Sequence, residues 1–435
     1  MPQKKQENLE KQWVKIKSIN ERGNGMSLTR FLPTPSDRMG ILWSLLSIEE
    51  SVIIEYGPAG TTHFSVSLFG ELDIEQKNRL YTTHMSEADV VMGDATRLEK
   101  AIKEVDKNNK PKVIFVVASS VAAVIGVDIK GICNYMQSEV NARLVAFDQG
   151  GFRGDYSAGV KEAYKMLANE LVVDTDKRDE NTYNIIGASL WSYRMRSDIN
   201  EVKRLLFEAF GLKMKACFCS DTSIEELEKA GEATLNIAIQ KTAVEASKIL
   251  ETRFNTPYVY GMPYGYEGTL QWLQQISSVI GKEINPKVVG ELREKIGMSK
   301  QYQMYKRMLR RDIMQATVIG EYDTVVGISD FLQQLGIEIN YKICTHSLKG
   351  IDADREDVIF LKTEKETIDI VKEAKKEMVL ADDTMLSLAD DSNTKLRIAP
   401  PVIKGMVLAR HLPLAGIYGA DYVLEYVQQY VQTLK

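Results

Sequence analysis

Short apolar runs rich in β-branched residues alternate with longer amphipathic stretches along most of the chain. Residues 113–117 (VIFVV) form a continuous apolar run, which is typical of a strand buried on both faces of a parallel sheet. A polar turn follows at 118–120, and the pattern then predicts one helix over 121–140 and a second strand over 143–147. This order of strand, helix and strand predicts a right-handed βαβ crossover.

Two further blocks repeat this alternation. In the second block we expect strands over 184–186, 212–218 and 257–260, a strand starting at Leu235, and helices over 198–210 and 243–254. In the third block we expect strands over 316–320 and 337–344, with a helix over 323–335 between them. Strands that alternate with helices favour parallel sheets, so the pattern predicts an α/β fold.

The expected division into domains follows from the length and from one polar segment. A chain of 435 residues is too long for a single core, so two to three domains are expected. The polar segment 175–181 lies between apolar blocks and is interpreted as a linker. We expect a charged N-terminal extension over 1–27 and domains over 28–174, 182–300 and 312–435, the last ending in a helix.

Composition argues against several classes of function. The net charge of −5 and the lack of a dominant basic stripe argue against a nucleic-acid-binding protein. No run of roughly 18 apolar residues occurs, so no membrane span is expected, and the charged N-terminus lacks the apolar core of a secretory signal. The cysteines are few and scattered, which favours a reducing cytoplasm over a disulfide framework. They are Cys133, Cys217, Cys219 and Cys344.

The chain lacks the sequence motifs that bind nucleotides. No GxxxxGK[ST] occurs, which argues against ATP binding through a P-loop, and no GxGxxG follows a strand. Cys217 and Cys219 alternate along an expected strand, which would place both sulfurs on one face. There they could serve as two soft ligands, as a redox pair or simply as packed side chains. Histidines occur only at positions 63, 84, 346 and 411, so a metal site built from this chain alone has few ligands available.

Four motifs in the N-terminal half occur together in one known family. They are the glycine turn 56–61 (YGPAGT), the segment 82–93 (TTHMSEADVVMG), the segment 125–129 (IGVDI) and the turn 151–154 (GFRG). Over about residues 28–427 the chain resembles the component 1 family of nitrogenases. That family includes catalytic subunits, cofactor-assembly scaffold subunits and dark-operative chlorophyll-pathway reductases. The resemblance implies an α/β architecture of three Rossmann-like domains with mainly parallel sheets around a central cleft.

The positions at which this family holds its shared iron–sulfur cluster carry no sulfur here. The cysteine that ends the glycine turn falls on Thr61, and the cysteine that follows the strand 113–117 falls on Ser120. A serine oxygen is a poor substitute in an all-thiolate cluster, and we expect Ser120 to cap the following helix instead. The third family cysteine falls in the segment 32–40, where Asp37 is the only hard ligand and is expected to cap a helix.

The positions that hold the family's active-site metallocofactor have changed too. The resemblance places the ligating cysteine at Gln240 and the ligating histidine at Ala415, four residues after His411. It also places the turn 151–154 near the cofactor cavity, where Arg153 would donate toward an anionic ligand, although the turn read alone is a generic turn after a strand. No catalytic or metal-ligating residue is assigned. The candidate cavity or interface positions are Thr61, Ser120, Arg153, Gln240 and His411.

Three functions stay open at this point. The resemblance first implies a subunit of a nitrogenase-like reductase complex, which pairs with a homologous cysteine-bearing subunit and receives electrons from an ATP-dependent P-loop iron protein. This chain alone would then bind no cofactor, and an iron–sulfur cluster or metallocofactor would be shared with the partner. The second function is a metallocofactor-assembly scaffold, and the third is a metal-free, self-associating protein that binds another ligand. The missing ligands argue against dinitrogen reduction in this chain's own cavity.

Overall fold

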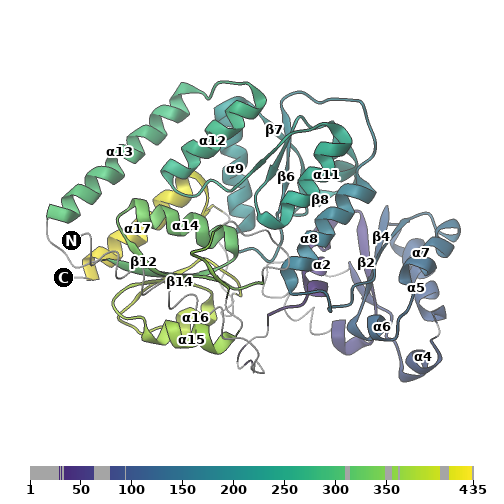
Figure 1. The fold of residues 1–435 in the computed structure, drawn as a ribbon. Coiled ribbons are helices and arrows are strands. Elements are labelled where there is room, and N and C mark those ends of the chain that lie inside the picture. The colour runs from purple at the N-terminus through teal and green to yellow at the C-terminus, as the bar shows by residue number, and fades with distance from the viewer. Residues whose placement is uncertain are drawn as a thin grey trace.

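The computed structural model describes most of the chain. The described residues are 29, 31, 34–62, 79–93, 95–308, 314–347, 355–360, 363–401 and 411–433. The N-terminal extension expected over 1–27 lies outside them. Figure 1 shows three α/β units, each built on its own parallel sheet, and no helix in the described ranges is long and apolar enough to cross a membrane. The α/β class and the parallel sheets are confirmed, whereas the predicted domain bounds stay a prediction.

Helices cover both faces of the first sheet, whose strand order is β3-β2-β4-β5. Its strands are β2 (Ser51–Tyr56), β3 (Leu80–Thr82), β4 (Val113–Ala118) and β5 (Arg143–Phe147), and its own helices are α4 (Glu87–Met92), α5 (Thr96–Asn109), α6 (Ser120–Val124) and α7 (Ile129–Met136). Because side chains alternate along β4, Val116 packs with α5 and α7. Phe115 packs on the other face with α2 (Asp37–Leu45) and α8 (Tyr156–Met166).

The prediction of a single helix over 121–140 is wrong. Gly126 adopts a φ of +71°, which favours glycine, and separates α6 from α7. Asp128 then caps the start of α7 with its side chain.

Two expected helix caps lie one residue away from the observed N-cap positions. The α6 helix is capped by Ser119, whose Oγ accepts a hydrogen bond from Ala122 N at 3.2 Å, and Ser120 is the first residue of the helix. Ser36 occupies the N-cap position of α2, and Asp37 is the first helical residue. The predictions that Ser120 and Asp37 cap these helices are therefore wrong.

The second sheet has the strand order β10-β9-β6-β7. Its strands are β6 (Thr182–Ile186), β7 (Lys213–Phe218), β9 (Leu235–Ala238) and β10 (Tyr258–Tyr260), with helices α9 (Met195–Phe210), α10 (Ile224–Glu228), α11 (Val244–Phe254), α12 (Tyr266–Ile280) and α13 (Pro286–Met308). A short parallel pair, β1 (Ile48–Glu49) with β8 (Thr222–Ser223), joins the first unit to the second. The strands and helices predicted for this block are confirmed to within a few residues.

The third sheet has the strand order β13-β12-β11-β14-β15. Its strands are β11 (Gln315–Gly320), β12 (Glu338–Cys344), β13 (Ile359–Phe360), β14 (Met378–Ala381) and β15 (Thr394–Arg397), with helices α14 (Tyr322–Gln334), α15 (Glu364–Glu373), α16 (Asp383–Leu388) and α17 (Gly416–Thr433). The sequence pattern predicted β11, α14, β12 and the C-terminal helix. It missed β13, β14, β15, α15 and α16, which are short elements.

Hydrophobic cores cross the boundaries between the units. One core joins the first and second units, and includes Trp43 and Phe218. A larger core joins the second and third units, and includes Leu206, Val318 and Val423. Helix α17 contributes to this larger core because it packs against α9 and α12 of the second unit (Figure 1). The three units are therefore held together by apolar burial rather than by linkers alone.

Two carboxylates of α9 hold the start of α17. Asp198 Oδ1 accepts hydrogen bonds from Leu414 N at 2.6 Å and from Ala415 N at 2.9 Å. Glu201 Oε1 accepts a hydrogen bond from Ile417 N at 3.0 Å. Burial raises the pKa of Asp198 to about 7. Ala415 is thus fixed through its backbone to the second unit.

Cys217 and Cys219 do not share a face, so that prediction is wrong. The β7 strand ends at Phe218, and Cys217 packs in the core that joins the second and third units. Cys219 packs instead in the core that joins the first and second units. Burial raises the pKa of the Cys217 thiol to about 12 and that of the Cys219 thiol well above its usual value. Both residues behave as packed side chains.

Helices α2 and α8 cross in direct backbone contact. A Cβ added to Gly159 would lie 1.7 Å from the carbonyl oxygen of Asp37. One added to Gly40 would lie 2.0 Å from the carbonyl oxygen of Tyr156. Only glycine permits this approach at the crossing. The contact fixes where α8 begins, and with it the position of Tyr156.

Replacing Gly159 with alanine should therefore destabilise the fold. The added methyl group overlaps the α2 backbone, so we expect a loss of roughly 1–3 kcal/mol or more in the free energy of unfolding, seen as a lower thermal midpoint by circular dichroism. Gly290→Ala is the control, because its Cβ meets open space in α13 and helix propensity predicts a gain of roughly 0.5–1 kcal/mol. Equal midpoints for the two variants would contradict the close crossing.

Candidate functional site

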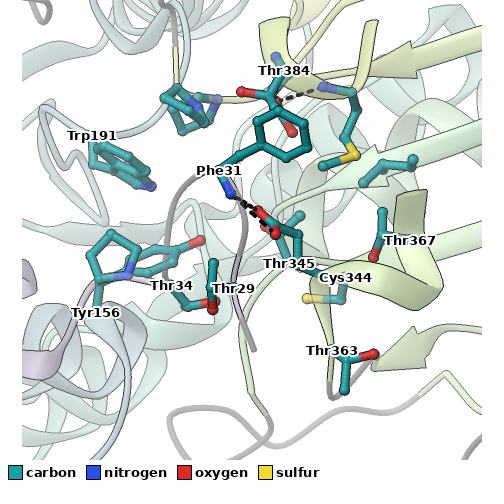
Figure 2. A pocket seen from close by; sticks show the side chains of 17 residues that line it. Thr29, Phe31, Thr34, Tyr156, Trp191, Cys344, Thr345, Thr363, Thr367 and Thr384 are labelled. Carbon is teal, nitrogen blue, oxygen red and sulfur yellow. Dashed lines mark hydrogen bonds between the residues drawn. The ribbon is translucent and has the colours of Figure 1, made fainter. Parts of the chain in front are cut away.

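Segments that follow strands of all three sheets contribute to a cavity of about 160 Å³ (Figure 2). Ligands of open parallel sheets usually bind at this end of the strands. The lining residues come from all three units and from the segment before α2. They are Thr29, Phe31, Thr34, Pro35, Tyr156, Trp191, Ile319, Cys344, Thr345, Thr363, Glu364, Thr367, Asp382, Thr384, Met385, Pro400 and Pro401.

One wall of this cavity is aromatic. Trp191, which follows β6, stacks on Trp43 of α2 with ring centroids 4.1 Å apart. The Tyr156 ring contacts three other rings: Trp191 and the imidazole of His346, each with centroids 5.8 Å away, and Trp43, at 6.1 Å. Figure 2 shows Trp191 and Tyr156 on one side and the threonine-rich surface of the third unit on the other.

A second, smaller cavity of about 20 Å³ shares Tyr156 with the larger one. Most of the residues that line it are of polar type, and they come from the first, second and third units. They are Tyr156, Ser157, Val160, Ser189, Gln240, Thr242, Glu321, Asp323 and His346. Tyr156 lines both cavities, and we call the two cavities together the junction.

Two carboxyl groups of the smaller cavity follow the end of β11. The hydroxyl groups of Ser192 and Tyr156 lie beside the carboxyl group of Glu321, and Tyr260 OH donates to Asp323 Oδ1 at 2.5 Å. Both carboxyl groups are enclosed by protein and keep part of their surface open to the cavity. Burial raises the pKa of Glu321 to about 7 and that of Asp323 to about 6.

His346 and Cys344 complete the side contributed by β12. His346 Nε2 accepts a hydrogen bond from Tyr322 N at 3.2 Å, so Nδ1 carries the proton and donates to Ser347 O at 3.2 Å. Burial lowers the pKa of His346, which keeps the ring neutral around pH 7. Burial also raises the pKa of the Cys344 thiol well above its usual value. The imidazole and the thiol are therefore both uncharged.

Two further carboxyl groups line the larger cavity. Asp382 Oδ1 accepts hydrogen bonds from Thr384 N at 2.8 Å and Met385 N at 3.1 Å, which caps α16, and burial raises the pKa of Asp382 to about 6. Both oxygens of Glu364 accept from Phe31 N, at 3.2 and 3.3 Å. Thr384 is 7% exposed, and its buried Oγ1 has no hydrogen-bond partner within the described part of the chain.

The structure brings one of the five sequence-predicted positions to this junction. Gln240 lines the smaller cavity and donates from Nε2 to Ser192 Oγ at 2.9 Å. His411 is exposed and lines neither cavity. A binding role for these five positions stays a prediction. The other three lie at the carboxyl edge of the first sheet: Thr61, Ser120 and Arg153.

At that edge the polar side chains serve the local fold. Thr61 Oγ1 donates to Pro58 O at 2.8 Å, within the glycine turn. Asp37 Oδ2 accepts from Arg153 N at 3.2 Å and so ties α2 to the turn after β5, and burial raises the pKa of Asp37. The guanidinium group of Arg153 is 59% exposed and lies 3.4 Å from Asp148 Oδ1.

The residues present do not fit an iron–sulfur cluster or a metallocofactor held as in the resembled family. Hydroxyl groups stand at Thr61 and Ser120, and each of the four cysteines is buried in a different hydrophobic cluster. Among the described residues, no group of three or more His, Cys, Asp or Glu could hold a metal ion. Thiolate ligation by this chain is therefore unsupported at both family sites.

Sequence reasoning missed most of the junction. A usable signal was present, because polar residues directly follow three apolar strands: Glu321 after β11, His346 two residues after β12, and Asp382 after β14. The carboxyl ends of parallel strands lie at the same edge of a sheet, so these three side chains are expected to lie close to one another. Tyr156 carried no such signal, because its place depends on the α2–α8 crossing.

Comparison with known proteins assigns the family. The family model described as nitrogenase component 1 type oxidoreductase matches residues 36–432. The chain is 26% identical over 67% of its length to the nitrogenase iron-molybdenum cofactor biosynthesis protein NifE of Clostridium pasteurianum, and spans 64% of that protein. It is 25% identical over 87% of its length to NifE of Nostoc sp., of which it spans 79%. It is 22% identical over 65% of its length to a light-independent protochlorophyllide reductase chain of Heliobacterium modesticaldum, and spans 55% of that protein.

A solved structure of nitrogenase Cp1 at pH 6.5 has the same fold. It matches with a TM-score of 0.77 at 17% sequence identity, over 96% of each chain. The chain belongs to the nitrogenase component 1 type oxidoreductase family. The family resemblance stated from the four motifs is thereby confirmed, as is the α/β architecture of Rossmann-like units.

Glu321→Gln should stabilise the protein more at higher pH. The folded-state pKa of Glu321 is about 7, well above its unfolded value, so the folded state binds the proton more tightly than the unfolded state does. The stability that this proton provides is therefore lost as the pH rises toward 7 and the carboxyl group ionises. The neutral amide avoids this loss, and we expect a gain of roughly 1–3 kcal/mol at about pH 8 and a smaller gain at about pH 5. Thermal unfolding at both pH values measures the difference.

The control for this variant is Glu373→Gln on the exposed face of α15. That substitution should leave the difference from the wild type the same at both pH values. A gain for Glu321→Gln that does not grow with pH would contradict burial of an ionisable group at the junction.

Proposed function

We propose that this chain is a subunit of a nitrogenase-like oxidoreductase complex. It pairs with a homologous subunit that carries the cluster-ligating cysteines, and it receives electrons from an ATP-dependent iron protein. The observation that carries the proposal is the carboxyl edge of the first sheet, where hydroxyl groups occupy the family's cluster positions and the segments that follow the strands expose apolar residues. Because this sequence has no P-loop, nucleotide-driven electron delivery has to come from another protein.

The turns at this edge are built in direct contact with one another. A Cβ added to Gly57 would lie 2.3 Å from Ser119 Oγ, so the turn after β2 touches the start of α6. A Cβ added to Gly151 would lie 3.2 Å from both Ser120 Oγ and Ser36 Oγ, so the turn after β5 touches α6 and the start of α2. The family's cluster positions therefore form one continuous patch that presents oxygen rather than sulfur.

The segments that follow strands of the first sheet expose four apolar side chains. Val91 and Met92 of α4 are 82% and 78% exposed, Val124 of α6 is 72% exposed, and Phe152 in the turn after β5 is 64% exposed. All four follow the carboxyl ends of first-sheet strands, and α4 has no buried residue. Exposed apolar side chains on the segments at one edge of a sheet favour a protein–protein interface there. The partner that fits this edge is a subunit that supplies cysteine thiolates, because this chain has no cysteine at the family's cluster positions.

The names of the relatives favour a second candidate, a scaffold that holds a cofactor during assembly. NifE proteins are among the relatives and are named for cofactor biosynthesis. A scaffold of this kind would use the same edge for a partner and would differ in whether the bound group is turned over. The third candidate, a metal-free self-associating protein, would bury the same edge against a second copy.

Pairing should depend on the exposed apolar residues. Full-length chain co-expressed with a homologous cysteine-bearing subunit should co-purify with it, and Val124→Asp combined with Met92→Asp should abolish the complex because charge would be buried at the interface. Size-exclusion chromatography with light scattering measures the loss. Phe207→Asp on α9 is the control, since Phe207 is 58% exposed on the second unit. A stable metal-free homodimer of the wild type, or pairing unaffected by the double substitution, would overturn the proposal.

Iron should follow the partner subunit. Purified anaerobically alone, this chain should contain no stoichiometric iron, because none of the family's ligand positions carries a sulfur here. The complex should contain iron, and replacing the partner's cysteines should remove it. Metal analysis and the visible absorption spectrum measure both. Full iron occupancy in the isolated chain would show that it supplies ligands of its own.

A further inference from the structure

We infer that the smaller cavity binds one ordered water molecule, and that this water and the carboxyl group of Glu321 form a proton-exchange site coupled to the larger cavity through the hydroxyl group of Tyr156. The use of this site rests on the proposed function, because a reductase that receives electrons must also supply protons. The site itself belongs to this chain alone, so it can hold or fail whether or not a partner subunit or an iron protein binds.

The size and polarity of the smaller cavity carry the first step. Its volume of about 20 Å³ exceeds the roughly 10–15 Å³ that one water molecule needs, and such a water also needs polar groups around it. Ser189 Oγ accepts a hydrogen bond from Trp191 N at 3.3 Å, which leaves the Ser189 proton able to donate into the cavity. Gln240 donates one amide proton to Ser192 and keeps a second. The lining thus offers hydrogen-bond donors as well as the carboxyl oxygens of Glu321.

Glu321 is the carboxyl group that is best placed to exchange a proton with this water. Both oxygens of Asp323 already accept hydrogen bonds from the second unit, Oδ1 from Tyr260 OH at 2.5 Å and Oδ2 from Lys241 N at 3.0 Å. Glu321 has hydroxyl groups beside it instead, and it keeps part of its surface open to the cavity. A hydroxyl group can donate to a carboxylate or accept from a protonated carboxyl group, so both states of Glu321 have partners.

Around pH 7 the two carboxyl groups are the groups of this cavity that change charge. Burial raises the pKa of Glu321 to about 7, and burial raises the pKa of Asp323 to about 6 against the opposing charge of Lys241. Burial lowers the pKa of His346, which faces the same cavity and stays neutral. The other titratable side chains that interact with Glu321 keep their protons because burial raises their pKa values; they are Tyr156, Tyr164, Tyr264 and Cys344. Glu321 can therefore gain and lose a proton while the hydroxyl, thiol and imidazole groups near it stay neutral.

Tyr156 couples this site to the larger cavity. Its hydroxyl group lies beside both Glu321 and Thr345, and Figure 2 shows Tyr156 and Thr345 among the residues that line the larger cavity. Thr345 Oγ1 donates a hydrogen bond to Gly320 O at 3.2 Å, so its own oxygen is left to accept from Tyr156. The Tyr156 hydroxyl group can therefore donate to the Glu321 carboxylate, or accept from the protonated carboxyl group while it donates toward the larger cavity.

The proton transfer that this arrangement permits conserves charge and moves no electrons. The Tyr156 hydroxyl group gives its proton to a base bound in the larger cavity and takes the proton of the Glu321 carboxyl group in the same step. Tyr156 thus stays neutral, and Glu321 becomes a carboxylate. The ordered water then passes a solvent proton to that carboxylate. The electrons of the reduction come from the iron protein of the proposed complex and do not pass through these groups.

Infrared pH titration of the isolated full-length chain tests the proton site. The C=O stretch of a protonated carboxyl group that is missing in Glu321→Gln identifies Glu321, and we expect this band to disappear with a midpoint at about pH 7. Tyr156→Phe removes a donor to the carboxylate and should raise the midpoint by roughly half a pH unit or more. Thr345→Val removes the acceptor that competes for the Tyr156 proton, so the midpoint should fall.

Tyr164→Phe is the matched control for these variants. Tyr164 lies on the same helix as Tyr156, and its buried hydroxyl group has no hydrogen-bond partner among the described residues. This substitution should leave the midpoint unchanged. Equal midpoints in the wild type, Tyr156→Phe and Thr345→Val would overturn the coupling through Tyr156, and so would shifts of the same sign in the last two.

A crystal structure of the full-length chain tests the water. One water peak should lie within hydrogen-bond distance of the Glu321 carboxyl group and of either Ser189 or Gln240. Well-ordered lining residues around a cavity without a water peak would overturn the water site. A water that contacts only one polar group would overturn it as well, because a single contact does not hold a buried water in place.

Discussion

The junction of the three units depends on the direct contact between helices α2 and α8. Two glycines at the crossing bring the helix backbones together, and this places Tyr156 at the first position of α8. Trp43 of α2 stacks on Trp191 of the second unit, and Tyr156 contacts His346 of the third. The contact between the two helix backbones thus positions aromatic rings that meet rings of the other two units. The aromatic wall of the cavity therefore depends on helix packing rather than on the conformation of a loop.

The departures from the family's ligand positions fall into two independent groups. At the edge of the first sheet, Thr61 and Ser120 carry oxygen at positions where the family has sulfur, and Thr61 donates a hydrogen bond within its turn while Ser120 begins α6. In the second group, the Gln240 side chain donates a hydrogen bond to Ser192, and the backbone N–H of Ala415 donates one to Asp198 of α9. The carboxyl groups of Glu321 and Asp323 line the smaller cavity beside Gln240. The change at the first sheet implies a partner that supplies thiolates, whereas the change at the junction affects which molecule the cavity can bind. These two consequences are independent of each other.

The sequence predicted those parts of the fold that depend on local pattern. Continuous apolar runs such as 113–117 became buried strands, because burial on both faces of a parallel sheet needs no polar alternation. The predicted caps Ser120 and Asp37 lie one residue after the observed N-cap positions, Ser119 and Ser36, because a run of adjacent polar residues does not show which of them is the last one outside the helix. The site was mostly missed because its members meet only through tertiary packing. Gln240 was found by resemblance and not by any local signal.

The carboxyl groups at the junction reduce the stability of the folded chain around neutral pH. Burial raises the pKa of Glu321, Asp323 and Asp382, so folding disfavours their ionised forms as the pH rises. Perturbed groups that gather in a cavity are typical of functional sites. A ligand that donates hydrogen bonds to these groups binds the folded state alone and recovers part of that loss.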